Sequence, residues 1–73
     1  MKAQILHHEN EIAEILQKRR KELKITQKEL AAFCKLSHNG ISKIELGQSE
    51  IKLSTLLKMS KMLGFAIALE MEE

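Results

Sequence analysis

Residues 26–47 read TQKELAAFCKLSHNGISKIELG, and this stretch decides the fold of the 73-residue chain. Thr26, followed by a glutamate three residues later, forms a capping box, and apolar residues at helical spacing predict a helix over 27–34. Ser37 is the next good N-cap, and the same spacing predicts a second helix over roughly 38–46. Two short helices joined by a tight turn are typical of the helix-turn-helix unit, whose second helix lies in the major groove of DNA.

The second predicted helix has an apolar side and a polar side. The apolar side is formed by Ile41 and Ile44, which are expected to be buried. The side chains left exposed are short or cationic hydrogen-bonding groups, the types that contact base edges and phosphates. They are His38, Asn39, Ser42 and Lys43.

The charge of the chain is unevenly distributed. The formal net charge is +2, but residues 17–43 carry eight basic residues against two acidic ones, a net of +6. The segments 1–16 and 44–73 each carry a net of −2. A polyanion would be both attracted and oriented by this pattern. The alternative is an ordinary solvated helix face, because short basic runs are common.

Length and composition favour one small domain without catalytic or metal chemistry. Cys34 is the single cysteine, so no internal disulfide forms, and it is expected to be a small buried hydrophobe. No apolar run approaches the roughly 20 residues needed to span a bilayer, and no signal peptide is visible, so we expect a cytoplasmic protein. No nucleophile–base set or glycine-rich phosphate loop is present, and the histidines lack zinc-site spacing. The sequence therefore predicts no enzyme activity, no metal and no cofactor.

Helices are also predicted on both sides of this unit. A first helix begins after Asn10, a candidate N-cap, and a last helix runs over about 53–63. Gly47 and Gly64 are expected to end the third and fourth helices. The apolar residues predicted for the buried face of the last helix are Leu53, Leu56, Leu57, Met59, Met62 and Leu63.

The tail after the last helix changes period. Its large apolar residues fall on every second position, which is the signature of a strand. They are Phe65, Ile67, Leu69 and Met71. A lone strand leaves its backbone groups unpaired, so we expect it to pair with the same segment of a second copy across a two-fold axis. The alternative is that the last helix continues to Met71.

Residues on both helices of the unit also resemble a known family. Thr26-Gln27-Lys28-Glu29-Leu30-Ala31, Leu36-Ser37, Ile41-Ser42-Lys43-Ile44-Glu45 and Gly47 look like the Cro/C1-type (XRE) helix-turn-helix family, over about residues 10–64. The resemblance implies an all-α, lambda-repressor-like DNA-binding domain of four to five helices. We therefore divide the chain into a flexible N-terminus over 1–9, a helix-turn-helix domain over 10–64, and a dimerisation strand with an acidic tail over 65–73.

The tail strand and the compact length are additionally similar to the HipB-type antitoxins. Members of that family are small dimeric repressors whose C-terminal strands pair across the dimer and which bind a HipA-type kinase toxin. The resemblance implies a homodimer that represses its own operon from a palindromic operator. Two alternatives stay open: a free-standing phage-type or restriction-system regulator without a toxin, and an inhibitor of a partner protein with only secondary DNA binding.

The resemblance also assigns roles by position. The base-reading residues it implies are His38, Asn39 and Lys43, with His38 donating to a base acceptor or a phosphate. The residues implied in phosphate contact or close approach are Thr26, Gln27, Lys28, Ser37, Gly40, Ser42, Gln48 and Ser49. Arg20 and Glu45 correspond to an ion pair between the first and third helices, the alternative being that Arg20 contacts phosphate. Lys35 stands where the family often has glycine, which predicts either a strained left-handed lysine or a different turn.

Overall fold

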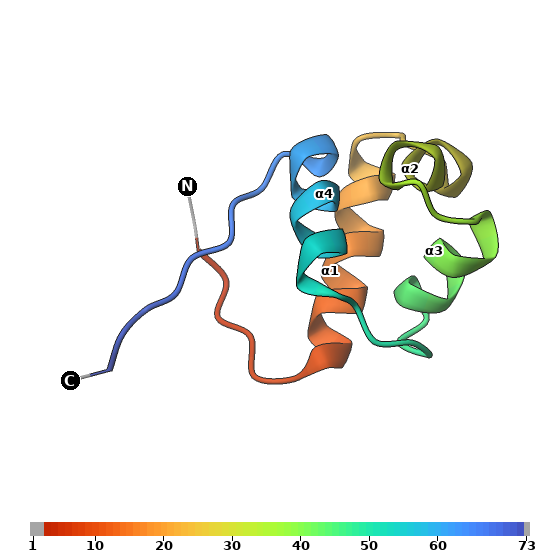
Figure 1. The fold of residues 1–73 in the computed structure, drawn as a ribbon. Coiled ribbons are helices and arrows are strands. Elements are labelled where there is room, and N and C mark those ends of the chain that lie inside the picture. The colour runs from red at the N-terminus through yellow and green to blue at the C-terminus, as the bar shows by residue number, and fades with distance from the viewer. Residues whose placement is uncertain (1–2, 73) are drawn as a thin grey trace.

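The computed structural model describes residues 3–72 and contains four helices in this range. They are α1 (Glu9–Glu22), α2 (Gln27–Cys34), α3 (His38–Glu45) and α4 (Leu53–Leu63). Helices α1 and α4 lie next to each other, α2 and α3 cover one side of this pair, and both chain ends leave on the other side (Figure 1). The all-α prediction is confirmed. The bounds of α2 and α4 match the predicted ranges, and α3 ends one residue early.

The start of α1 differs from the prediction. Asn10 is not the N-cap: the helix begins at Glu9, after an extended His8 whose side chain makes no capping hydrogen bond. Instead, Glu9 and Glu11 place negative charge in the first turn, where the helix dipole favours it. Acidic side chains in the first turn, rather than a side-chain cap, therefore stabilise the start of α1.

All four helices contribute to one hydrophobic core. Leu16 of α1, Leu30 of α2, Ile41 of α3 and Met59 of α4 are at most 1% exposed. Cys34 is buried as predicted, and burial raises the pKa of its thiol, which keeps the sulfur protonated and unreactive.

The buried face of α4 is rotated from the predicted one. Leu53 and Leu57 are 64% and 46% exposed, while Met59 and Leu63 are fully buried. Leu56 is half-buried, so the core-facing stripe runs through positions three and four residues apart, 56, 59 and 63. The prediction that Leu53 and Leu57 belong to the core was wrong, because the six apolar residues of this helix cover more than the one face that packs.

One or two positions after the last residue of each helix, the chain passes through a residue in the left-handed conformation. These residues are Lys24, Lys35, Gly47 and Gly64. In each case the next residue donates its backbone N–H to the carbonyl five residues back, which closes a Schellman-type end. The glycines were predicted, and Lys35 has a φ of 58°, so the strained alternative is the correct one. Lys24 shares the same φ, and nothing in the sequence analysis anticipated it.

The tail leaves the helical body at Gly64. Residues 65–72 form no regular secondary structure, so the continued helix is wrong. No strand occurs anywhere in residues 3–72, and the paired strand stays a prediction because a single chain supplies no second strand for it. Ile67, Leu69 and Met71 are 42%, 84% and 79% exposed. Residues 1–2 and 73, which belong to the predicted N-terminus and acidic tail, lie outside the described residues.

Across residues 3–72, no helix combines the length and the apolar character that crossing a membrane would require.

Candidate nucleic-acid interface

Both helices of the α2–α3 unit begin with side-chain caps. The Thr26 hydroxyl accepts from the backbone N–H of Glu29 at 3.0 Å, and the Glu29 carboxylate accepts from the backbone N–H of Thr26 at 2.9 Å. Hydrogen bonding of the carboxylate by Thr26, first by its backbone N–H and then by its side chain, lowers the pKa of the Glu29 carboxyl. Ser37 caps α3 by accepting from the backbone N–H of Gly40 at 2.9 Å. The starts of both helices are therefore set by hydrogen bonds from capping residues that the sequence itself supplies.

An ion pair between α1 and α3 holds the unit on the rest of the domain. Arg20 donates from Nε to Oε2 of Glu45 at 2.7 Å and from Nη2 to Oε1 at 2.9 Å. A third nitrogen, Nη1, donates to the carbonyl of Ile25 at 2.8 Å, just before α2. Both charged residues are buried, at 8% and 5% exposure. The expected ion pair is present, and Arg20 is engaged inside the protein rather than free to contact a phosphate.

The hydrogen bonds continue from this ion pair to the surface. Gln27, the first residue of α2, donates from Nε2 to Oε1 of Glu45 at 3.0 Å. Its Oε1 lies 2.9 Å from Nε2 of His38, the first residue of α3. Nε2 of Gln27 carries a second N–H, which is still available to donate to a phosphate. The phosphate contact assigned to this residue by resemblance therefore stays a prediction.

The polar side of α3 is open to solvent. His38, Asn39 and Ser42 line one shallow depression on the surface. Lys43 is exposed and lies one turn beyond Asn39, on the same side of the helix. The residue types predicted to read bases are thus gathered on one exposed face.

Gly40 lies close to the side chain that caps α3. A Cβ at this position would lie 3.2 Å from Oγ of Ser37, tighter than most real contacts. A larger residue would therefore press on the group that caps α3. This accounts for a glycine inside a helix, where it costs about 0.5–1 kcal/mol relative to alanine.

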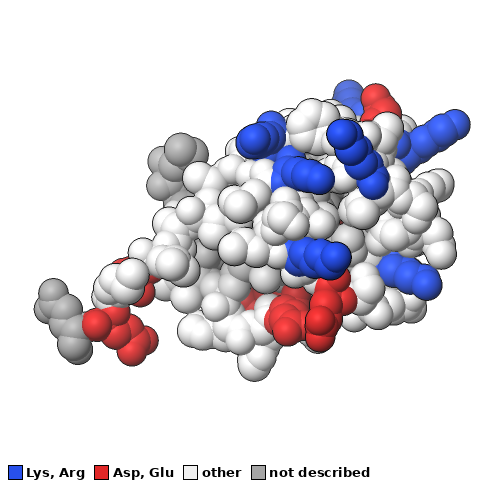
Figure 2. Space-filling model, viewed as in Figure 1, with Lys and Arg blue, Asp and Glu red and all other residues white. Residues whose placement is uncertain are grey.

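The remaining predicted phosphate contacts surround this face. Thr26 and Lys28 are exposed at the start of α2, and Gln48 and Ser49 are exposed in the loop after α3. Lysine and arginine side chains are spread over the helical body, while acidic side chains gather near the start of α1 and along the tail (Figure 2). The basic character of residues 17–43 is therefore displayed on the surface.

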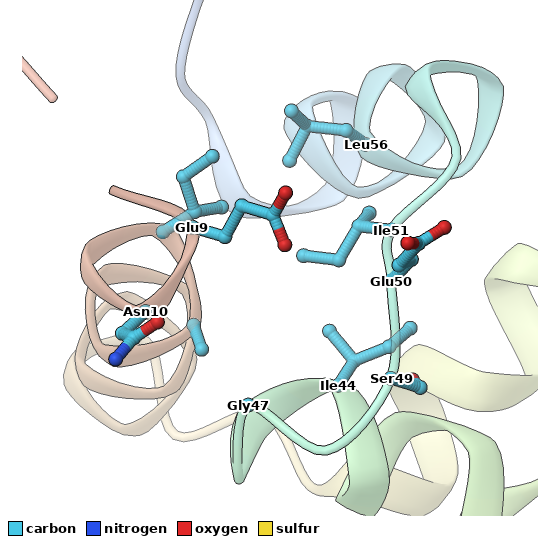
Figure 3. Close-up of a pocket in the computed structure, with 10 residues that line it drawn as sticks. Glu9, Asn10, Ile44, Gly47, Ser49, Glu50, Ile51 and Leu56 are labelled. Carbon is cyan, nitrogen blue, oxygen red and sulfur yellow. The ribbon is translucent and has the colours of Figure 1, made fainter. Parts of the chain in front are cut away.

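A separate hollow of about 280 Å³ lies between the start of α1, the loop after α3, and α4 (Figure 3). Its floor is apolar, with Ile51 and Leu56, and the carboxylates of Glu9 and Glu50 stand at its edge. These carboxylates would repel a phosphate and disfavour its binding inside the hollow, although Ser49 is also among the lining residues. No group of three side chains within residues 3–72 is arranged to hold a metal ion.

The sequence match agrees with this geometry. Residues 16–69 match the model of a helix-turn-helix family. The chain belongs to the XRE-type helix-turn-helix family. It is therefore a DNA-binding domain of the XRE type, and the matched range contains the complete α2–α3 unit.

Solved structures share the fold of this XRE-type domain over nearly its whole length. They include an "MDT Protein", a HipB variant in complex with an O2 20mer, and a HipA–HipB–O2–O3 complex. Each has a TM-score of 0.81 and 22% identity, covering 97%, 99% and 97% of this chain and 100% of the other. At this identity the likeness is one of fold. No curated protein matches the sequence.

The sequence predicted the caps at Thr26 and Ser37 and the exposed residues of α3, and the family resemblance implied the ion pair, but the contact between Gln27 and His38 was not predicted. A glutamine and a histidine eleven residues apart carry no local signal of an interaction. The contact exists because the crossing of α2 and α3 brings their first residues together.

Proposed function

We propose that this chain is a sequence-specific transcriptional repressor that binds a palindromic operator as a homodimer. The observation that supports it best is the exposed polar face of α3, held by a buried ion pair and two capped helix starts. A rigid helix that presents hydrogen-bonding side chains to solvent is suited to enter the major groove.

The proposed contacts follow from the chemistry of each group. Asn39 can form a bidentate pair with adenine, and Lys43 can reach guanine acceptors or a phosphate. The start of α2 offers free backbone N–H groups and the positive end of a helix dipole, beside the Lys28 side chain. Phosphate contacts there would set the register of α3 without carrying sequence information.

We propose that the tail joins two copies. Three of its apolar residues, Ile67, Leu69 and Met71, are exposed in a single chain, while Phe65 packs on the core. Strand pairing with a second copy would satisfy the backbone groups while covering the exposed side chains. A two-fold axis would then place the two α3 helices about 34 Å apart, one turn of DNA. Occupying the promoter of its own operon would repress transcription.

We further propose a kinase toxin of the HipA type as protein partner, with the chain acting as a cytoplasmic antitoxin that has no catalytic activity. Support comes from the shared fold with HipB chains found in complexes with O2 DNA and with HipA, and from the apolar tail. A regulator without a toxin would have the same DNA-binding face, so only a partner search separates these two.

The test is to express the chain with its genomic neighbours and to identify the protein and DNA that purify with it. A stoichiometric kinase-like protein together with a palindrome from upstream of its own gene is the expected result. Affinity for that palindrome should fall steeply with salt, since basic residues replace counterions. A variant carrying both Asn39→Ala and Lys43→Ala should lose the palindrome and keep the protein partner. Recovery of the chain with DNA alone would contradict the antitoxin role, and salt-insensitive recovery without DNA would contradict repression.

A further inference from the structure

We propose that Glu45 and Gln27 fix the tautomer of His38, so that α3 prefers adenine or cytosine at the base that His38 faces. This inference deepens the proposed function and rests on it. It assigns positioning roles to two residues that lie behind the DNA-facing surface, and it names the class of base edge that the histidine recognises.

The first step is the fixed polarity of the buried carboxylate. Both oxygens of Glu45 accept from the guanidinium of Arg20, at 2.7 Å and 2.9 Å. A carboxylate held in this way only accepts hydrogen bonds. The Glu45 side chain has no exposed surface, so water does not compete for its oxygens. Any further partner of Glu45 must therefore present a donor.

The second step orients the Gln27 amide. The amide nitrogen must be the atom that faces Oε1 of Glu45, because the amide oxygen has nothing to donate. The amide oxygen of Gln27 consequently faces His38, 2.9 Å from Nε2. The usual ambiguity between the two ends of an amide is removed by the carboxylate.

The third step sets the proton on the histidine ring. The oxygen of Gln27 only accepts, so Nε2 of His38 must carry hydrogen. A neutral imidazole has one N–H, which leaves Nδ1 as a bare acceptor. Through Glu45 and Gln27, the guanidinium of Arg20, buried between α1 and α3, therefore determines that the exposed His38 presents an acceptor to a ligand. We call this series of hydrogen bonds the relay.

A protein acceptor placed in the major groove favours a base that presents a hydrogen-bond donor there. Adenine N6 and cytosine N4 present donors there, whereas guanine and thymine present acceptors at the equivalent positions. His38 is exposed and lines the same depression as Asn39 and Ser42, so the residue belongs to the reading face, and Nδ1 is the ring nitrogen that Gln27 leaves available to a base. This differs from the expectation stated above that His38 donates to a base acceptor or a phosphate.

The relay can be tested without DNA. Gln27→Lys replaces the amide with an ammonium that pairs with Glu45 and donates to Nε2 of His38, which should move the ring proton to Nδ1. Gln27→Met keeps the length and removes the polarity. Long-range ¹H–¹⁵N spectra of each protein at about pH 8, above the ordinary histidine pKa of about 6.5, report which ring nitrogen is protonated.

Wild type should show Nε2–H at His38, and Gln27→Lys should show Nδ1–H. The exposed His7 and His8 should keep the same spectra in both proteins and serve as internal controls. An unchanged His38 tautomer in Gln27→Lys would overturn the relay.

The base preference is tested on the operator. The base pair that His38 faces is the one whose preference disappears in His38→Ala. At that pair, wild type should prefer adenine or cytosine over guanine or thymine on the facing strand by roughly threefold to tenfold, the worth of one hydrogen bond. The preference should fall below about twofold in Gln27→Met and reverse in Gln27→Lys. Affinity ratios between bases are compared within each protein, so the sequence-independent effect of the added lysine charge on affinity cancels.

A wild-type preference for guanine or thymine, or an intact preference in Gln27→Met, would overturn the inference while leaving the repressor function standing. Absence of any sequence-specific binding would overturn the repressor function and the base preference together. The spectra would still decide whether the relay exists.

Discussion

The α2–α3 unit and the tail of this XRE-type domain differ in how many of their interactions are made within one chain. Within residues 26–47, both helix starts are capped, and Glu45 is held by three hydrogen bonds. Within residues 65–72, no regular structure forms, and Leu69 is 84% exposed. The difference separates a region that is capped and hydrogen-bonded within one chain from one whose residues Ile67, Leu69 and Met71 are exposed in that chain.

Removing one member of the Arg20–Glu45 ion pair should have the largest effect on the stability of the domain. Arg20→Met leaves the buried Glu45 charge without its partner and should lower the free energy of unfolding by about 3–5 kcal/mol. Urea denaturation followed by circular dichroism measures the loss. Lys21→Met, at the exposed neighbouring position, is the matched control and should change stability by no more than about 0.5 kcal/mol. Similar values for both variants would mean that the pair does not stabilise the fold.

A charge on the apolar side of the tail should break the pairing of two copies. Leu69→Asp should weaken the dimer by about 2–3 kcal/mol, thirtyfold to hundredfold, because a carboxylate would be buried in the strand interface. Ala68→Asp puts the same charge on the opposite face of the predicted strand and should have little effect. Sedimentation equilibrium measures both. Equal effects would argue against a paired strand, since alternation is its defining property.

Asn39→Ala should relax the preference at one base pair by about 1–3 kcal/mol. The comparison variant is Lys28→Ala, at the start of α2, which should weaken all sequences alike and reduce the salt slope by about one. Binding to the operator and to single-base variants of it gives both quantities. Losses of the same size on operator and random DNA for Asn39→Ala would remove this residue from base reading.

The two left-handed lysines should show the smallest effect. Lys35→Gly and Lys24→Gly should each raise the free energy of unfolding by about 0.5–1 kcal/mol, because glycine adopts a φ of 58° without the strain that a side chain brings. Lys35→Ala removes the same charge and keeps the strain, so it isolates the backbone contribution. Equal stability of the glycine and alanine variants would show that these helix ends are not strained.

The sequence predicted those features whose cause is local. The bounds of α2 and α4, the caps at Thr26 and Ser37, and the helix end at Gly64 all follow from residues within a few positions of each feature. The left-handed Lys35 was among the predictions only because the family often has glycine there. Lys24 has no such precedent, and its positive φ lies in the short connection between α1 and α2.

The features that were missed depend on how the helices pack. Leu53 and Leu57 were placed in the core because apolar spacing alone cannot say which of two overlapping faces of α4 is buried. The contact of Gln27 with His38 needs the crossing of α2 and α3 to be known first. The pairing of the tail needs a second chain, so it stays a prediction for both the sequence and a single-chain structure.

We propose that two copies joined by their tails read one palindromic site. Native mass spectrometry of the full chain, mixed with a palindromic operator selected from random duplexes and with its isolated half-site, tests this most directly. We predict two chains on the palindrome at concentrations that leave the half-site largely free, since linkage of two sites raises affinity by a hundredfold or more. One chain per duplex, with equal affinity for palindrome and half-site, would contradict the account.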